Sequence, residues 1–148
     1  MQEIKQIVVP VDLGKNIQKL IDFAIYMADQ LDSEISFFHC IEEIIEMGEM
    51  ALGSFSHDDY NSERVRYAKE ALEEIVKNAT GKYKKCTSKV VVGDVVDEII
   101  DYAKKRNANM IIMGTHGKRG LEKILLGSVA DRVLKTAHCP VLLMNPHR

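Results

Sequence analysis

The residues best suited to chemistry lie in one glycine-rich segment, which reads Gly114-Thr115-His116-Gly117-Lys118-Arg119-Gly120 and continues to Gly127-Ser128-Val129. Glycines let a backbone approach a phosphate closely and take up positive φ angles without penalty. A helix beginning at Ser128 would offer free N–H groups and the positive end of its dipole to an anion. Lys118 or Arg119 could neutralise phosphate charge. The segment therefore predicts a phosphate-binding loop.

A purely structural role is the alternative. Gly114 and Gly117 could only shape a turn, and Ser128 could cap the helix, because Ser128 to Asp131 resembles a capping box. His116 could equally donate to a phosphate or lie in solvent. Spacing excludes a Walker-type loop, since two residues separate Gly114 from Gly117 and an arginine follows Lys118. The absence of GxGxxG after the first apolar run argues against a dehydrogenase.

Short apolar runs alternate with helical periodicity along the chain of 148 residues. The predicted strands are 4–11, 35–41, 87–92, 110–113 and 140–144, and the predicted helices are 20–31, 62–79, 95–103 and 128–137. This alternation favours a single α/β domain, 1–148, with a Rossmann-like, doubly wound open parallel sheet of order 3-2-1-4-5 and helices on both faces. The connection of about residues 42–60 is long enough for a lid or a partner surface.

In such a sheet, ligands bind outside the carboxyl ends of the strands, where the strand order reverses. The first and fourth strands flank that point, and they are followed by Asp12 and Gly114. A lone carboxylate together with phosphate oxygens and water is a plausible Mg²⁺ site. Asp12 could instead cap the following helix. Topology thus selects the glycine segment and Asp12 independently of any motif.

The spacing Gly114-x-x-Gly117-x9-Gly127-Ser128 resembles the nucleotide-binding signature of the universal stress proteins. The resemblance extends along the chain. Residues 7–12 look like the family's first strand and its acidic residue, and Phe38-His39-Cys40 is similar to the end of its second strand. Residues 93–99 and 139–142 look like the exit of its third strand and the entry to its last.

The resemblance implies the ATP-binding branch of the family, with the following roles. Pro10 to Asp12 would line the adenosine pocket, Cys40 would contact adenine through its backbone, and the glycines and Ser128 would wrap the triphosphate. The complete predicted nucleotide-binding set is Pro10, Val11, Asp12, Cys40, Met113, Gly114, Thr115, His116, Gly117, Lys118, Arg119, Gly127, Ser128 and Val129. ATP and Mg²⁺ are the expected cofactors, with Asp12 as an indirect metal contact.

The predicted function is that of an ATP-binding stress-response or signalling module with slow or no hydrolysis. A weak ATPase or nucleotidyl-transfer enzyme is one alternative, and a dimeric interaction protein that binds no nucleotide is another. AMP or a cyclic nucleotide could replace ATP as the natural ligand. The resemblance also implies a homodimer, and an apolar edge strand at Pro140–Met144 would pair with a second copy.

Composition and charge narrow the classes of function and of cellular location that the chain could have. A formal net charge of -2 gives no basic surplus for nucleic acid, and no apolar run approaches the roughly 20 residues that span a bilayer. The first residues lack the layout of a signal peptide, and three cysteines without a CxxC pair suit a reducing cytoplasm. His39 is expected to be a satisfied core histidine, and the pairs His39-Cys40 and His138-Cys139 lack zinc-ligand spacing.

Overall fold

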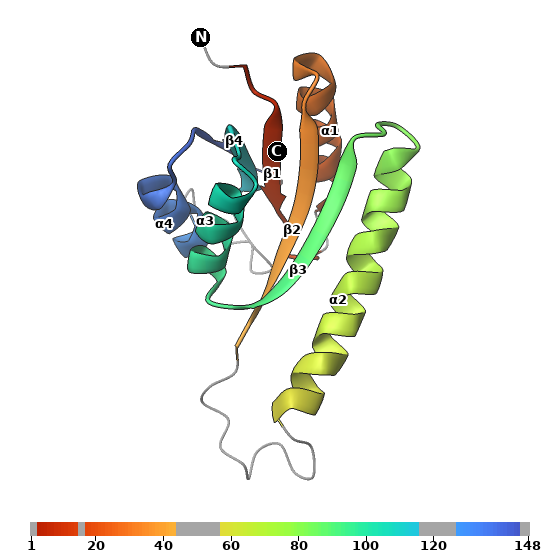
Figure 1. Cartoon of the computed structure of the whole chain (residues 1–148), viewed down its shortest axis with the longest axis vertical. Coiled ribbons are helices and arrows are strands. Elements are labelled where there is room, and N and C mark those ends of the chain that lie inside the picture. Colours follow the sequence, from red (N-terminus) through yellow and green to blue (C-terminus); the bar gives the residue numbers. More distant parts are fainter. Residues whose placement is uncertain (1–2, 15–16, 44–56, 116–126, 146–148) are drawn as a thin grey trace.

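The protein folds into one parallel sheet of five strands that is flanked by helices (Figure 1). The computed structural model describes residues 3–14, 17–43, 57–115 and 127–145. The strands are β1 Gln6–Pro10, β2 Glu34–Glu42, β3 Cys86–Gly93, β4 Met110–Gly114 and β5 Val141–Met144. The helices are α1 Ile17–Leu31, α2 His57–Thr80, α3 Val95–Lys105 and α4 Ser128–Thr136.

The strand order is β3-β2-β1-β4-β5, and every pairing is parallel, which confirms the predicted topology. The largest boundary difference concerns α2, which begins at His57 rather than near Ser62. Its first residues, 57–61, are mostly polar and continue no apolar stripe, so periodicity could not detect them. Residues 44–56, which make up most of the long predicted connection, lie outside the described residues.

Helices cover both faces of the sheet, α1 and α2 on one and α3 and α4 on the other (Figure 1). Ile7 and Val9 of β1 pack in the core beneath α1 and α2, whereas Val8 packs beneath α3 and α4. All three side chains are at most 1% exposed. A strand buried on both faces needs a continuous apolar run rather than an alternating one, which explains the sequence of β1.

Asn109 joins the start of β4 to the start of β1. Its Oδ1 accepts hydrogen bonds from the backbone N–H groups of Lys5 and Gln6, at 2.8 and 2.9 Å. Its own N–H donates to the carbonyl of Gln6 at 2.8 Å. One amide side chain therefore sets how the two central strands align.

Asn109→Ala should lower the free energy of unfolding by about 1–3 kcal/mol, because two backbone donors lose their acceptor. Urea denaturation followed by circular dichroism measures this change. Asn78→Ala is the matched control, since Asn78 is exposed on α2 and alanine is the better helix former. An equal loss in both variants would contradict the role of Asn109.

No helix in the described parts of the chain is long and apolar enough to cross a bilayer.

Candidate functional site

The strand order reverses between β1 and β4, the pair in which Ile7 lies opposite Met110 and Val8 opposite Ile111. Continuing this register places the exit of β1 beside the exit of β4. The carbonyl of Gln6 accepts from Asn109, so the backbone groups of alternate β1 residues, Pro10 included, face β4. Proline has no N–H to donate. Pairing therefore weakens at the carboxyl end of these strands, where a ligand crevice is expected.

Asp12 shapes the turn that leaves β1. Its Oδ1 accepts a hydrogen bond of 2.9 Å from the N–H of Gly14, which closes a tight turn through Leu13 at φ 60°. Left-handed backbone costs a residue such as leucine about 1–2 kcal/mol and often marks a functional site. Gly14 precedes Ile17, the first residue of α1, so this bond holds the turn after β1.

The described ends of the glycine segment are held together. Thr115 donates its N–H to the carbonyl of Met144 at 2.9 Å, which fixes it beside β5. The N–H of Gly127 donates to the carbonyl of Thr115 at 2.8 Å. Because of this bond, α4 starts directly beside the end of β4, which is one of the two strands that flank the switch point.

Gly127 rather than Ser128 is the N-cap of α4, so the capping-box interpretation is wrong. The cap makes no side-chain hydrogen bond, since glycine has no side chain to offer. The first helical bond joins Asp131 N–H to the carbonyl of Gly127 at 2.9 Å. The N–H groups of residues 128–130 precede that bond and have no acceptor within the helix. This donor set suits phosphate oxygens, so the described start of α4 fits the phosphate part of a ligand.

Asp131 places a carboxylate in the first turn of α4, where it would oppose a bound anion. Lys135 lies one turn further along and pairs with it, with Nζ 3.0 Å from Oδ2. The side chains are 41% and 73% exposed, so the pair contributes little stability. Its effect at this site is to offset a negative charge near the helix start.

Cys40, at the end of β2, lies in surroundings that differ in charge from the start of α4. Its half-buried thiol donates to the carbonyl of Gly93 across the strand pair, with Sγ and O 3.6 Å apart. Burial, together with the nearby carboxylates of Glu98 and Asp94, raises the pKa of Cys40 to about 12. The thiol is therefore neutral, and its surroundings are negative. The two ends of the candidate site thus differ in charge.

The three thiols should resist alkylation at pH 8, because only the thiolate reacts. Burial also raises the pKa of Cys86 to about 11 and that of Cys139 above its ordinary value. The folded-state pKa of Cys40 exceeds the unfolded one, so its contribution to stability is complete below about pH 9 and declines as the pH rises toward 12.

A chromogenic disulfide reagent should react at least about tenfold more slowly with the native chain than with the chain in urea. Cys40→Val should in addition reduce the loss of stability between pH 9 and pH 11. Equal reaction rates in the native and unfolded chain would contradict the assigned environment.

The other predicted site residues fall into three groups. Val11 and Met113 are 6% and 5% exposed and Pro10 is also buried, so these residues could meet a ligand mainly through the backbone. Gly114 and Val129 are partly exposed, and Ser128 is exposed. The residues His116, Gly117, Lys118 and Arg119 lie outside the described part of the chain.

Sequence reasoning missed the acidic neighbours of Cys40. Register places Cys40 opposite Val91, which brings the exit of β3 and the start of α3 to the exit of β2. Asp94 is the N-cap of α3, and its Oδ1 accepts from Asp97 N–H at 3.0 Å. The dipeptide Gly93-Asp94 signalled the end of a strand, but only the pairing of β2 with β3 shows what it lies against.

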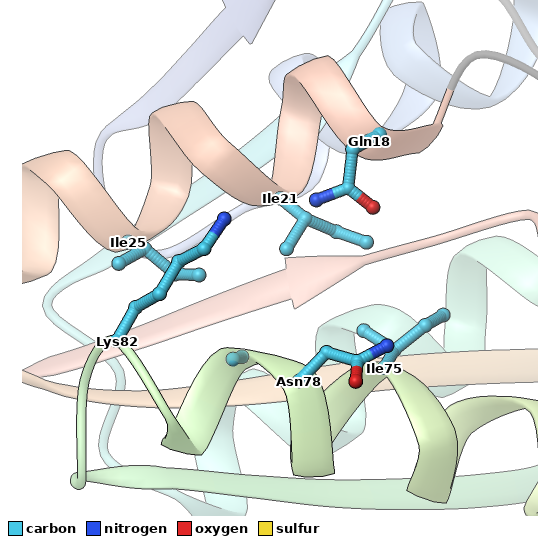
Figure 2. A pocket seen from close by; sticks show the side chains of 7 residues that line it. Gln18, Ile21, Ile25, Ile75, Asn78 and Lys82 are labelled. Carbon is cyan, nitrogen blue, oxygen red and sulfur yellow. The ribbon is translucent and has the colours of Figure 1, made fainter.

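A separate hollow of about 40 Å³ lies between α1 and α2 (Figure 2). Gln18, Ile21 and Ile25 line it from α1, and Ile75 and Asn78 line it from α2. Sites for small molecules and cofactors occupy about 300 Å³ or more. This hollow holds little more than a water molecule and does not compete with the switch point.

Fold and site together define an α/β protein with an anion-compatible helix start next to the strands that flank a topological switch point. The family model of the universal stress protein family matches residues 3–145, and the chain belongs to that family. It is 38% identical over 142 residues to universal stress protein MJ0531 of Methanocaldococcus jannaschii, covering 95% of this chain and 82% of the relative.

Solved structures share the fold of this chain. Hypothetical protein MJ0577 of M. jannaschii is similar at a TM-score of 0.82 and 28% identity, with 97% of each chain covered. The universal stress protein of Archaeoglobus fulgidus in complex with dAMP is similar at 0.66 and 23%, over 96% of this chain and 98% of that one. A universal stress protein in complex with cAMP is similar at 0.66 and 17%, over 98% and 99%.

Proposed function

We propose that this chain binds an adenine nucleotide, ATP with Mg²⁺ foremost, in the crevice between the ends of β1 and β4. The observation that carries the proposal is the start of α4, where the glycine N-cap makes no side-chain hydrogen bond to the first backbone donors. The Thr115–Gly127 hydrogen bond holds those donors beside β4, the neighbour of the strand that Asp12 follows. A helix start and a nearby carboxylate are the parts that a metal-bridged phosphate requires.

Electrostatics assign an orientation to the nucleotide. The start of α4 attracts phosphate, whereas Asp94 and Glu98 beside Cys40 repel it. The triphosphate therefore points toward Gly127 and Ser128, and the base points toward Cys40. Asp12 follows β1, the strand between these two ends, where ribose or a magnesium-bound phosphate oxygen would reach it.

Other members of the fold support this choice of ligand. The dAMP and cAMP complexes involve proteins less than 25% identical to this chain, so they show that the fold accommodates adenine nucleotides and nothing finer. The biological role that follows is a nucleotide-dependent stress or signalling module of one domain acting in the cytoplasm. The chemistry derived above concerns binding, and hydrolysis is expected to be slow.

The two edges of the sheet favour a homodimer through β5. The exposed residues at the start of β3 are Thr87, Ser88 and Lys89, and a lysine on an edge strand discourages pairing. β5 consists of Val141–Met144, which are apolar, partly exposed and paired on one side with β4. Light scattering during size-exclusion chromatography should give twice the mass of the chain at micromolar concentration, and a monomer alone would contradict the dimer.

Nucleotide released from the natively purified protein tests the function directly. Mass spectrometry should find an adenine nucleotide in the heat-denatured supernatant. Added ATP, AMP and cAMP should then raise the melting temperature in the order of their affinities, because a ligand of the native state stabilises it. No released nucleotide and no thermal shift with any of the three at millimolar concentration would overturn the proposal.

A further inference from the structure

The imidazole of His39 makes a hydrogen bond at the point where β1 and β2 separate. Its Nδ1 lies 2.6 Å from the carbonyl oxygen of Val11. A carbonyl can only accept, so Nδ1 carries the proton and donates. The N–H of Val11 donates to the carbonyl of Phe38 at 2.8 Å, so both backbone polar groups of Val11 are directed at β2.

This bond differs from the one a parallel ladder would make next. Pro10 lies opposite Phe38, so a continued ladder would join the carbonyl of Val11 to the N–H of Cys40. Instead, the ring of His39 lies at that carbonyl. Phe38 presents its carbonyl to β1, and alternation along a strand directs the backbone N–H and carbonyl of Cys40 to the same side. The ring therefore occupies the acceptor that would otherwise engage Cys40.

We propose that His39 is a positioning residue that ends the pairing of β1 with β2 at Val11 and so keeps the backbone edge of Cys40 open to a ligand. That edge offers one donor and one acceptor side by side, the pattern that a nucleobase amine and its neighbouring ring nitrogen complement. The same bond fixes Val11, the residue before Asp12. One side chain thereby sets the spacing between the base end of the site and its carboxylate.

The identity of the ligand in this inference rests on the proposed function, but the role of the ring does not. His39→Phe retains a planar ring and removes the donor, whereas His39→Asn places an amide N–H close to the position of Nδ1. The first variant should let the ladder extend to Cys40, and the second should restore the native arrangement.

Hydrogen exchange in the ligand-free protein tests the backbone claim. The Cys40 amide should exchange at least about tenfold more slowly in His39→Phe than in the wild type, because it gains a ladder bond, and His39→Asn should exchange as the wild type does. An unchanged Cys40 amide in His39→Phe would overturn the inference whether or not any nucleotide binds. If His39→Phe does not fold, His39→Leu provides the same loss of donor.

Calorimetry with two probes tests the consequence for binding. His39→Phe should lower the affinity for ATP about tenfold and change the affinity for inorganic tripolyphosphate by no more than about twofold. His39→Asn should recover the wild-type affinity for ATP. An equal loss of affinity for both probes, or no loss for either, would overturn the inference. Failure of the wild type to bind ATP and tripolyphosphate would instead count against the proposed function, and the exchange result would still decide the role of His39.

Discussion

Gly127→Val should reduce the affinity for ATP at least about 100-fold, or about 2.7 kcal/mol, while the chain keeps its fold. Gly127 caps α4, and its neighbours supply the helix N–H groups assigned to phosphate. A branched side chain there would stand where the phosphate must approach the backbone. The backbone angles, φ −59° and ψ 150°, are ones that valine adopts readily, so the fold should survive. Calorimetric titration measures the affinity, and circular dichroism checks the fold.

Gly81→Val is the matched control for this substitution. Gly81 is exposed in the turn after α2, and a Cβ there would lie 3.4 Å from the carbonyl of Asn78, which is an ordinary contact. Gly81→Val should therefore bind ATP as the wild type does. Gly127→Ala, with its smaller side chain, should fall between the wild type and Gly127→Val. Wild-type affinity in Gly127→Val would show that phosphate does not approach this glycine.

Asp12→Asn should remove the effect of Mg²⁺ on ATP binding and leave the turn after β1 intact. The amide oxygen of asparagine can still accept the hydrogen bond from Gly14, but the negative charge that attracts a metal ion is lost. In the wild type, Mg²⁺ should strengthen ATP binding about tenfold or more. In Asp12→Asn, ATP without Mg²⁺ should bind at least as tightly as in the wild type, because a repulsion between like charges disappears.

Two further variants make this test specific. Asp12→Ala removes both the negative charge and the hydrogen bond to Gly14, so it should also weaken the binding of ATP in the absence of metal. Asp29→Asn removes a carboxylate from an exposed position of α1 and should keep the full effect of Mg²⁺. Titration of each variant with ATP, in EDTA and in Mg²⁺, provides the comparison. A full Mg²⁺ effect in Asp12→Asn would exclude Asp12 from the metal site.

The topology and the location of the candidate site could be predicted because they follow from local patterns. The apolar run of β1 requires burial on both faces, and alternating strands and helices require parallel crossovers. The N-cap of α4 was harder to predict, because serine and glycine are both good N-caps and the sequence places Gly127 and Ser128 side by side. The cap became clear only from the hydrogen bond of Asp131 to Gly127.

Features that depend on register or on unusual backbone angles could not be predicted. The turn of Asp12 requires Leu13 at a positive φ, which leucine does not favour and which no sequence pattern announces. The carboxylates near Cys40 depend on the pairing of Cys40 with Val91. His39 was predicted to be a satisfied core histidine; its bond to Val11 shows that the ring has a partner, but the residue is only half-buried and lies at the margin of the core. Its place at the end of a ladder is what suggests the further role.

The affinity of the wild-type chain for ATP tests the central claim most directly. Isothermal titration with ATP in Mg²⁺, on protein first freed of bound nucleotide by unfolding and refolding, should show saturable binding of one ATP per chain. Tripolyphosphate should compete for the same sites, because the phosphates are assigned to the start of α4. No heat of binding at millimolar ATP, together with an unchanged melting temperature, would contradict the account.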